Sequence, residues 1–477
     1  MSIAKKNIGL IMGPLGFAVL LWTAPFAGLN EAANGVLACA FWMAIWWVFD
    51  AIPMAATALL PIVLFPITGG LPLSVTTASY GHQYIFLFFG GFILAIAIEK
   101  WNLHKRLALQ IIALVGTRKP YIVLGFMIAT AFLSMWISNT AAAVMILPVG
   151  MAIAAHIEGD GASKNGHFGK ALLLSIAYSA SIGGMATLIG TPPNLVMAGV
   201  IYETYGVEIT FFDWFVFAFP LSVALLLITW FFLTRVAFKV DSSADSNGKK
   251  EVRKMLKSLG HITKQERYVL VVFILMALAW VFRSLVLVHF IPQIDDTIIA
   301  IIGALLLFLI PAKKGEALVN WEDTKRLPWG IMVLFGGGIA LANGFESSGL
   351  ARWIGEHFLM LKSVPAWILL VLLVLGVNFL TEITSNLATT AMLLPILTSV
   401  ASAIQIHPYM LIMGATLAAS CAFMLPVATP PNAVVFGSGY LKINEMVRVG
   451  FWLNLISTVL IALVLFGLLP LIWDLQP

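Results

Sequence analysis

Two short polar clusters interrupt long apolar runs of this chain, and their side chains are of the kinds that bind small ions. The first cluster is Ser138-Asn139-Thr140, and the second is Ser385-Asn386 followed by Leu387. Hydroxyl, amide and freed carbonyl oxygens suit a hard cation such as Na⁺, whereas free N–H groups at helix N-termini attract anions. The residue types therefore indicate joint binding of an anion and cations. No Ser/His/Asp set or metal-ligand set lies within one apolar region, so an enzyme is not indicated.

A second motif, Thr-Pro-Pro-Asn, follows each cluster, at residues 191–194 and again at residues 429–432. Proline lacks an N–H group, so we expect exposed carbonyl groups just before the paired prolines, at Gly190 and Ala428. Lipid cannot satisfy freed backbone groups, and irregular backbone persists in a membrane where it lines a cavity. A duplicated pair of interrupted helices therefore indicates the binding site of a transporter.

Charged residues inside the apolar runs are few: Asp50, Glu382, Glu99 and Arg283. Asp50 and Glu382 fit either a functional role or a structural role as acceptors for nearby N–H groups. No arginine lies beside either polar cluster. An anion bound there must be neutralised by helix dipoles and by bound cations, which would couple its transport to Na⁺.

The composition requires elements that cross a membrane. The chain of 477 residues is 61% hydrophobic and 10% charged, with a mean hydropathy of +0.99, whereas soluble domains carry roughly 25% charge. Apolar runs such as 8–26, 216–233, 268–290 and 453–472 are long enough to span a bilayer. The two cysteines lie in apolar runs and indicate no disulfide framework. The basic residues lie along loops and are not clustered with aromatic residues that could stack on bases, so no nucleic-acid partner is expected.

The basic residues predict the orientation in the membrane. Nine of the 27 Lys and Arg residues lie in the linker 235–267, and most others lie in loops that alternate with it. The intervening loops 28–35, 69–83, 202–213 and 292–296 contain no basic residue. The positive-inside rule then predicts a cytoplasmic N-terminus, an extracytoplasmic C-terminus and about eleven spans.

The two halves of the chain form an internal repeat. Phe89-Gly90-Gly91 recurs as Phe335-Gly336-Gly337, and Pro148 recurs as Pro395, both pairs close to an offset of 247 residues. The flanking basic loops lie on opposite sides in the two halves, which predicts inverted repeats. We expect an all-α polytopic membrane protein with a re-entrant hairpin and a broken helix in each half. The expected first half is 1–238, with a hairpin at about 120–157 and a broken helix at about 171–200; a cytoplasmic amphipathic linker occupies 239–266; the second half is 267–477, with a hairpin at about 364–404 and a broken helix at about 409–437.

Residues 419–435 resemble the signature of the divalent-anion:Na⁺ symporter family, the INDY-type di- and tricarboxylate transporters. The paired Ser-Asn clusters with downstream Thr-Pro-Pro-Asn motifs also resemble that family, and the resemblance covers essentially the whole chain. It implies a homodimer in the bacterial inner membrane, with scaffold and transport domains in each protomer and an elevator mechanism. It also implies co-transport of a dicarboxylate with Na⁺ bound at two sites or more.

The resemblance further implies which residues bind each ligand. The first Na⁺ site would use Ser134, Ser138, Asn139 and Gly190, and the second would use Thr381, Thr384, Asn386 and Ala428. The substrate carboxylates would meet Ser138, Asn139, Thr140, Thr191, Ser385, Asn386, Leu387, Thr429 and Pro430.

One position departs from the family pattern. Leu387 stands where many dicarboxylate-selective members have threonine. Loss of a hydroxyl partner can change selectivity by large factors, so the preferred anion stays open at this point. The predicted function is Na⁺-coupled symport of C4-dicarboxylates such as succinate, malate and fumarate. The alternatives are a citrate or sulfate carrier, a Na⁺-independent dicarboxylate exchanger and, from another class, an anion channel.

Overall fold

The computed structural model describes residues 3–23, 26–116, 118–158, 166–242, 246–313 and 315–473. Within these residues, eight helices are long and apolar enough to cross a membrane, and six more apolar helices are shorter. The only strands among them form a small antiparallel pair, β1 (Pro311–Lys313) with β2 (Glu316–Ala317). The prediction of a helical polytopic membrane protein is confirmed, and the number of eleven spans stays a prediction.

The helices of the first half precede the linker. They are α1 (Ile3–Trp22), α2 (Glu31–Phe49), α3 (Met54–Thr57), α4 (Leu60–Thr68), α5 (Leu73–Ala78), η1 (Ser79–Gly81), α6 (Gln83–Lys100), α7 (Leu103–Leu114), α8 (Lys119–Ser134), α9 (Asn139–Glu158), α10 (His167–Gly184), α11 (Pro192–Tyr205), α12 (Phe211–Phe231) and η2 (Phe232–Ala237).

The linker and the second half supply the remaining helices. They are α13 (Ser246–Ser258), α14 (Lys264–Phe282), η3 (Arg283–Leu287), α15 (Val288–Phe290), α16 (Asp296–Leu309), η4 (Trp321–Arg326), α17 (Trp329–Ser348), α18 (Leu350–His357), η5 (Leu359–Ser363), α19 (Ala366–Leu380), α20 (Asn386–Ile404), α21 (Pro408–Ala419), α22 (Pro430–Phe436), α23 (Ile443–Gly467) and α24 (Leu469–Ile472).

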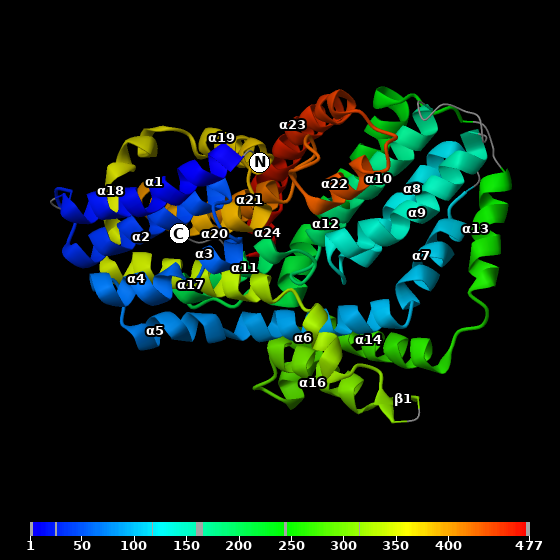
Figure 1. Ribbon diagram of the computed structural model, residues 1–477, viewed down its shortest axis with the longest axis horizontal. Helices are drawn as coiled ribbons and strands as arrows, with labels where there is room; N and C mark the ends of the chain where they lie inside the picture. Colours follow the sequence, from blue (N-terminus) through cyan, green and yellow to red (C-terminus); the bar gives the residue numbers. More distant parts are fainter. Residues whose placement is uncertain are drawn as a thin grey trace.

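The two hairpins, α8–α9 and α19–α20, lie toward opposite ends of the molecule, and the interrupted helices lie between them (Figure 1). Helix α10 packs against both arms of the first hairpin, and α21 packs against both arms of the second. The chain then crosses over, because α11 packs against α20 and α22 packs against α9. This exchange brings the two helix breaks, which are far apart in sequence, to the middle of the molecule.

Local chemistry explains why each interrupted helix breaks and restarts where it does. A residue before proline is pushed toward extended backbone, and Thr191 and Thr429 have φ of −142° and −139°. Proline is favoured in the first turn of a helix, because its missing N–H would have no helical partner there. Accordingly α11 begins at Pro192 and α22 begins at Pro430.

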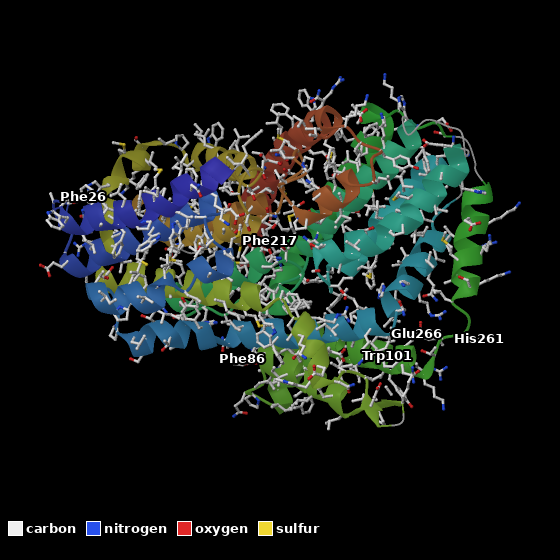
Figure 2. The ribbon with its side chains drawn as sticks, viewed as in Figure 1. Phe26, Phe86, Trp101, Phe217, His261 and Glu266 are labelled. Atoms are coloured by element: carbon white, nitrogen blue, oxygen red, sulfur yellow. The ribbon has the colours of Figure 1, made fainter. Side chains whose placement is uncertain are left out.

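The linker helix α13 packs against α7 and α9, and Val252 on it is buried. The chain after α13 is fastened to α7 by Arg106, which lies 3.1 Å from Glu266 and donates to the carbonyl groups of Leu259 and Gly260. Figure 2 labels Glu266, His261 and Trp101 at this end of the molecule. The basic linker thus has a fixed connection to the first half.

Candidate functional site

A cavity of about 870 Å³ lies between the two hairpin tips and the two helix breaks. Its lining includes every predicted site residue except Ser134 and Thr381: Ser138, Asn139, Thr140, Gly190, Thr191, Thr384, Ser385, Asn386, Leu387, Ala428, Thr429 and Pro430. Ser134 and Thr381 are fully buried and do not line the cavity. Their hydroxyl groups contact the side chains of Asn139 and Asn386, respectively. The fold therefore brings both motifs of both halves to one place.

The remaining part of the lining comes from other helices and is mostly apolar. Its lining residues are Trp47, Val48, Asp50, Pro53, Met54, Ala55, Phe92, Pro328, Gly330, Ile331 and Leu334, from α2, α3, α6, α17 and the segments beside them. Asp50 is the only charged residue among the residues that line this cavity in the described parts of the chain. None of the described residues that line the cavity has a basic side chain to neutralise an anion.

Helix N-termini supply the positive potential that the side chains lack. Helices α9, α11 and α20 begin at Asn139, Pro192 and Asn386, and all three of these residues line the cavity. Each such terminus is equivalent to about half a positive charge, so the three together supply roughly one and a half. Helix α22 also begins at the cavity, although its seven residues give it a smaller dipole. This arrangement favours an anion with two negative charges.

Several donors at these termini are free to bind a ligand. Ser138 accepts a hydrogen bond from the N–H of Ala141 at 3.2 Å, which caps α9. In contrast, the side chains of Thr191, Ser385 and Thr429 make no cap hydrogen bond. The Thr429 hydroxyl is also buried without a hydrogen-bond partner in the described chain. A carboxylate in the cavity would satisfy such groups.

The first polar cluster is rich in oxygen, and it is short of protons when the amide oxygen of Asn139 faces Ser134. Ser134 Oγ lies 2.6 Å from Asn139 Oδ1 and also 2.6 Å from the Ala180 carbonyl oxygen. A hydroxyl has one proton and can donate to only one of these two acceptors. A bound cation would stabilise the oxygen that is left without a donor.

The Asn139 amide can take two orientations, and only the second satisfies its described neighbours without a bound ion. In one, the amide oxygen faces Ser134 Oγ and the carbonyl oxygens of Ala180 and Gly190. In the other, the amide nitrogen donates to those carbonyl groups at 3.3 Å each. Bound Na⁺ favours the first orientation, and an empty site favours the second, because only the second supplies protons to the facing oxygens.

The second cluster repeats this arrangement. Thr381 Oγ1 lies 2.8 Å from Asn386 Oδ1 and 3.0 Å from the Ala419 carbonyl oxygen. The Thr384 hydroxyl donates to the Leu380 carbonyl at 2.8 Å, so its side chain is already engaged within the hairpin. Carbonyl groups of Ala180 and Ala419 thus join the clusters, although neither residue was identified from the sequence.

The asparagine of each Thr-Pro-Pro-Asn motif bridges the helix break before it. The Asn194 amide donates to the carbonyl groups of Gly184, Met185 and Thr187, the last at 2.8 Å. The Asn432 amide likewise donates to Ala422 and Leu425 in the second break. Both Thr-Pro-Pro-Asn motifs were identified from the sequence, but the sequence did not show that the asparagine side chains stabilise the helix breaks.

Glu382 holds the second break in a way that the first half does not repeat. Its buried carboxylate accepts hydrogen bonds from the N–H groups of Phe423, Met424 and Leu425 at 2.8–2.9 Å and from the Asn454 amide at 2.8 Å. The residue 247 positions earlier is Met135. Of the two roles that the sequence suggested for Glu382, the structure therefore supports the structural one, as an acceptor for N–H groups.

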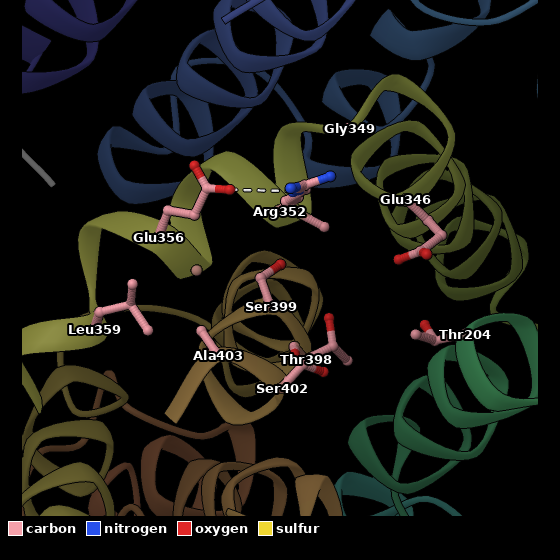
Figure 3. Close-up of a pocket in the computed structure, with 12 residues that line it drawn as sticks. Thr204, Glu346, Gly349, Arg352, Glu356, Leu359, Thr398, Ser399, Ser402 and Ala403 are labelled. Carbon is pink, nitrogen blue, oxygen red and sulfur yellow. Dashed lines mark hydrogen bonds and ion pairs between the residues drawn. The ribbon is translucent and has the colours of Figure 1, made fainter. Parts of the chain in front are cut away.

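A second pocket, of about 420 Å³, lies between α18 and α20 and contains none of the predicted site residues (Figure 3). Arg352 lies there between Glu356, to which it is hydrogen-bonded at 3.0 Å, and Glu346. Two carboxylates and one guanidinium leave an excess of negative charge. This pocket is therefore unsuited to a dianion.

Comparison with known proteins places the chain in a family. Residues 5–473 match the model of the sodium:sulfate symporter transmembrane region. The chain belongs to the sodium:sulfate symporter family. A protein of Staphylococcus saprophyticus named sodium-dependent dicarboxylate transporter SdcS is 45% identical over 473 residues, covering 97% of this chain and 91% of that protein. The Staphylococcus aureus protein of the same name is 44% identical over 479 residues, covering 98% and 92%.

Two solved structures share the fold at low sequence identity. Neisseria gonorrhoeae MtrF has a TM-score of 0.58 and 13% identity over 95% of this chain and 98% of that chain. Alcanivorax borkumensis YdaH has a TM-score of 0.59 and 15% identity over 86% and 89%. Membership of the sodium:sulfate symporter family confirms the prediction of a membrane transporter rather than an enzyme.

Proposed function

We propose that this protein is a Na⁺-coupled symporter for C4-dicarboxylates such as succinate, malate and fumarate. The observation that carries the proposal is one cavity that has helix N-termini, two oxygen-rich clusters and no basic side chain among the described residues that line it. The N-termini favour the dianion, and the clusters favour cations beside it. The relatives named sodium-dependent dicarboxylate transporters support this choice of substrate.

The two oxygen clusters support at least two Na⁺ sites, at the residues predicted from the sequence. Inward movement of a dianion against a negative-inside potential costs about 2.3 kcal/mol per charge at 100 mV. Two Na⁺ ions would only balance the dianion, whereas a third would make each cycle carry net positive charge inward. We therefore propose that more than two Na⁺ ions accompany each dicarboxylate.

We also propose that the protein works by an elevator mechanism, as a homodimer in the bacterial inner membrane. One wall belongs to the hairpins and interrupted helices, and the other wall to α2, α3, α6 and α17. We propose that the first group forms the transport domain and moves against the second, the scaffold. The moving domain would then comprise the hairpins and interrupted helices, with the bounds predicted from the sequence.

The charge distribution indicates which side this cavity faces. Pro328 and Gly330, at the start of α17, line the cavity and come shortly after η4, which carries Lys325 and Arg326. By the positive-inside rule this end is cytoplasmic, which agrees with a cytoplasmic N-terminus and an extracytoplasmic C-terminus. We therefore propose that the structure represents an inward-facing state.

The test is uptake of radiolabelled succinate into proteoliposomes, with an inward gradient of either Na⁺ or K⁺. We expect saturable uptake only with Na⁺, and weak competition by excess citrate or sulfate. Strong competition by citrate or sulfate would instead identify that anion as the substrate. Uptake that ignores Na⁺ but requires internal dicarboxylate would make the protein an exchanger, and uptake without saturation would indicate a channel.

A further inference from the structure

Asp50 lines the substrate cavity but belongs to a different group of helices from the two polar clusters. It follows directly after α2, it is exposed, and it is the only charged residue among the described residues that line the cavity. Its carboxylate has no hydrogen bond or ion pair with any other described residue, whereas Glu382 is fully hydrogen-bonded. The structural role that fits Glu382 therefore does not fit Asp50.

The carboxylate of Asp50 is also locally unfavourable. Asp50 has φ 47° and ψ 45°, the left-handed conformation, which asparagine and glycine adopt at least as readily. It caps the C-terminus of α2, where the helix dipole is negative and a carboxylate is repelled. An uncharged residue would fit this backbone better. The charge of Asp50 is unfavourable for the local backbone and helix end, and it lies beside a ligand cavity. This combination points to a role in function.

We propose that Asp50 is a charged residue at the cytoplasmic rim that speeds release of the dicarboxylate into the cytoplasm. This inference rests on the proposed function and on the inward-facing assignment. A fixed negative charge beside the cavity repels the dianion at the step in which it leaves its site. Asp50 belongs to the scaffold wall, so it faces the substrate only when the transport domain is on the cytoplasmic side.

The charge of Asp50 affects transport rates and the affinity for dicarboxylate on the cytoplasmic side. It does not alter how much dicarboxylate accumulates at equilibrium, because the ion gradients determine that. The expected effect is modest, because a unit charge acts on the dianion through a partly water-filled cavity. Over about one Debye length, a change of roughly threefold to tenfold in apparent affinity is expected. Added salt should reduce the effect.

The test compares the KM for labelled succinate in inside-out and right-side-out membrane vesicles from one expression host. Asp50→Asn and Asp50→Gly both remove the charge and both tolerate the left-handed backbone, whereas Asp50→Glu retains the charge. Glu322→Gln is the matched control, because it removes an exposed carboxylate on η4, outside the cavity. KM is measured at constant Na⁺, with and without added choline chloride.

We expect Asp50→Asn and Asp50→Gly to lower the KM in inside-out vesicles by about threefold to tenfold and to leave it unchanged in right-side-out vesicles. Asp50→Glu and Glu322→Gln should resemble the unmodified protein, and choline chloride should shrink the difference. An unchanged inside-out KM with normal Na⁺-dependent uptake would overturn the role of Asp50 and leave the proposed function standing. Equal changes on both sides, or different effects of Asn and Gly, would also overturn it. Absence of Na⁺-dependent uptake in the unmodified protein would overturn the proposed function itself.

Discussion

Replacement of Glu382 by glutamine should weaken Na⁺ binding at the second cluster without unfolding the protein. The carboxylate accepts three hydrogen bonds through Oε1, from Phe423, Met424 and Asn454, and one through Oε2, from Leu425. Glutamine keeps one acceptor oxygen, so its best orientation retains the three bonds and turns an NH₂ group toward the N–H of Leu425. One bond is lost, and the other three lose the assistance of the negative charge.

Loss of a charge-assisted hydrogen bond with one buried donor left unpaired costs roughly 2–4 kcal/mol. The cost falls close to the second cation cluster, because the Leu425 carbonyl accepts from the N–H of Ala428 at 3.2 Å and from the Asn432 amide at 3.1 Å. If about half of the cost is borne by the sodium-bound state, the affinity for Na⁺ falls by about tenfold.

The assay is the Na⁺ concentration for half-maximal succinate uptake in proteoliposomes, with the thermal midpoint of the purified protein measured alongside. Glu445→Gln is the control: Glu445 also accepts a backbone N–H and pairs with Lys170 at 2.6 Å, but it does not line the cavity. We expect both variants to lower the thermal midpoint, and only Glu382→Gln to raise the half-maximal Na⁺ concentration. An unchanged Na⁺ dependence of Glu382→Gln, with the midpoint lowered, would refute the coupling of this loop to the cation cluster.

Four further substitutions test the clusters and the selectivity of the cavity. Asn139→Ala and Asn386→Ala should each abolish Na⁺-dependent uptake while gel-filtration elution stays normal; near-normal uptake in both would remove the cation sites from these positions. Leu387→Thr restores a hydroxyl beside the substrate and should change the ranking of succinate against citrate in competition assays; an unchanged ranking places residue 387 outside the selectivity shell. Gly184→Ala should raise the half-maximal Na⁺ concentration by about tenfold, because a Cβ there would lie 2.4 Å from Asn139 Oδ1. Gly376→Ala is its control, since a Cβ at that position meets nothing within 4 Å, and an equal effect of both would contradict the steric argument.

Much of the local structure could be predicted from the sequence because short-range chemistry determines it. Proline cannot donate a backbone hydrogen bond, so the paired prolines alone predict where α11 and α22 begin. Apolar runs of sufficient length predict helices that cross the bilayer, because lipid leaves the backbone no other way to satisfy its polar groups. The duplication also indicated that two similar binding clusters exist, at Asn139 and Asn386.

Other features depend on packing between segments that are far apart in the chain. The sequence suggested two roles for Glu382 and Asp50 alike, and only the tertiary structure separated them. Glu382 lies beneath the loop before α22, where four donors converge on it. Asp50, at the end of α2, lines the cavity. Its carboxylate has no hydrogen-bond or ion-pair partner among the described residues. Neither environment is encoded by neighbouring residues.

The sequence by itself determined that this protein is a helical membrane protein with two interrupted polar sites, since hydropathy, proline placement and residue type act within a few turns of a helix. Only the tertiary structure decided that α11 and α22 each cross to the opposite hairpin, so that the helix N-termini face one cavity. That crossing depends on contacts between the two halves, which no local pattern specifies. The positive potential of the site is therefore a property of the assembled fold, because it comes from helix ends and not from any basic side chain.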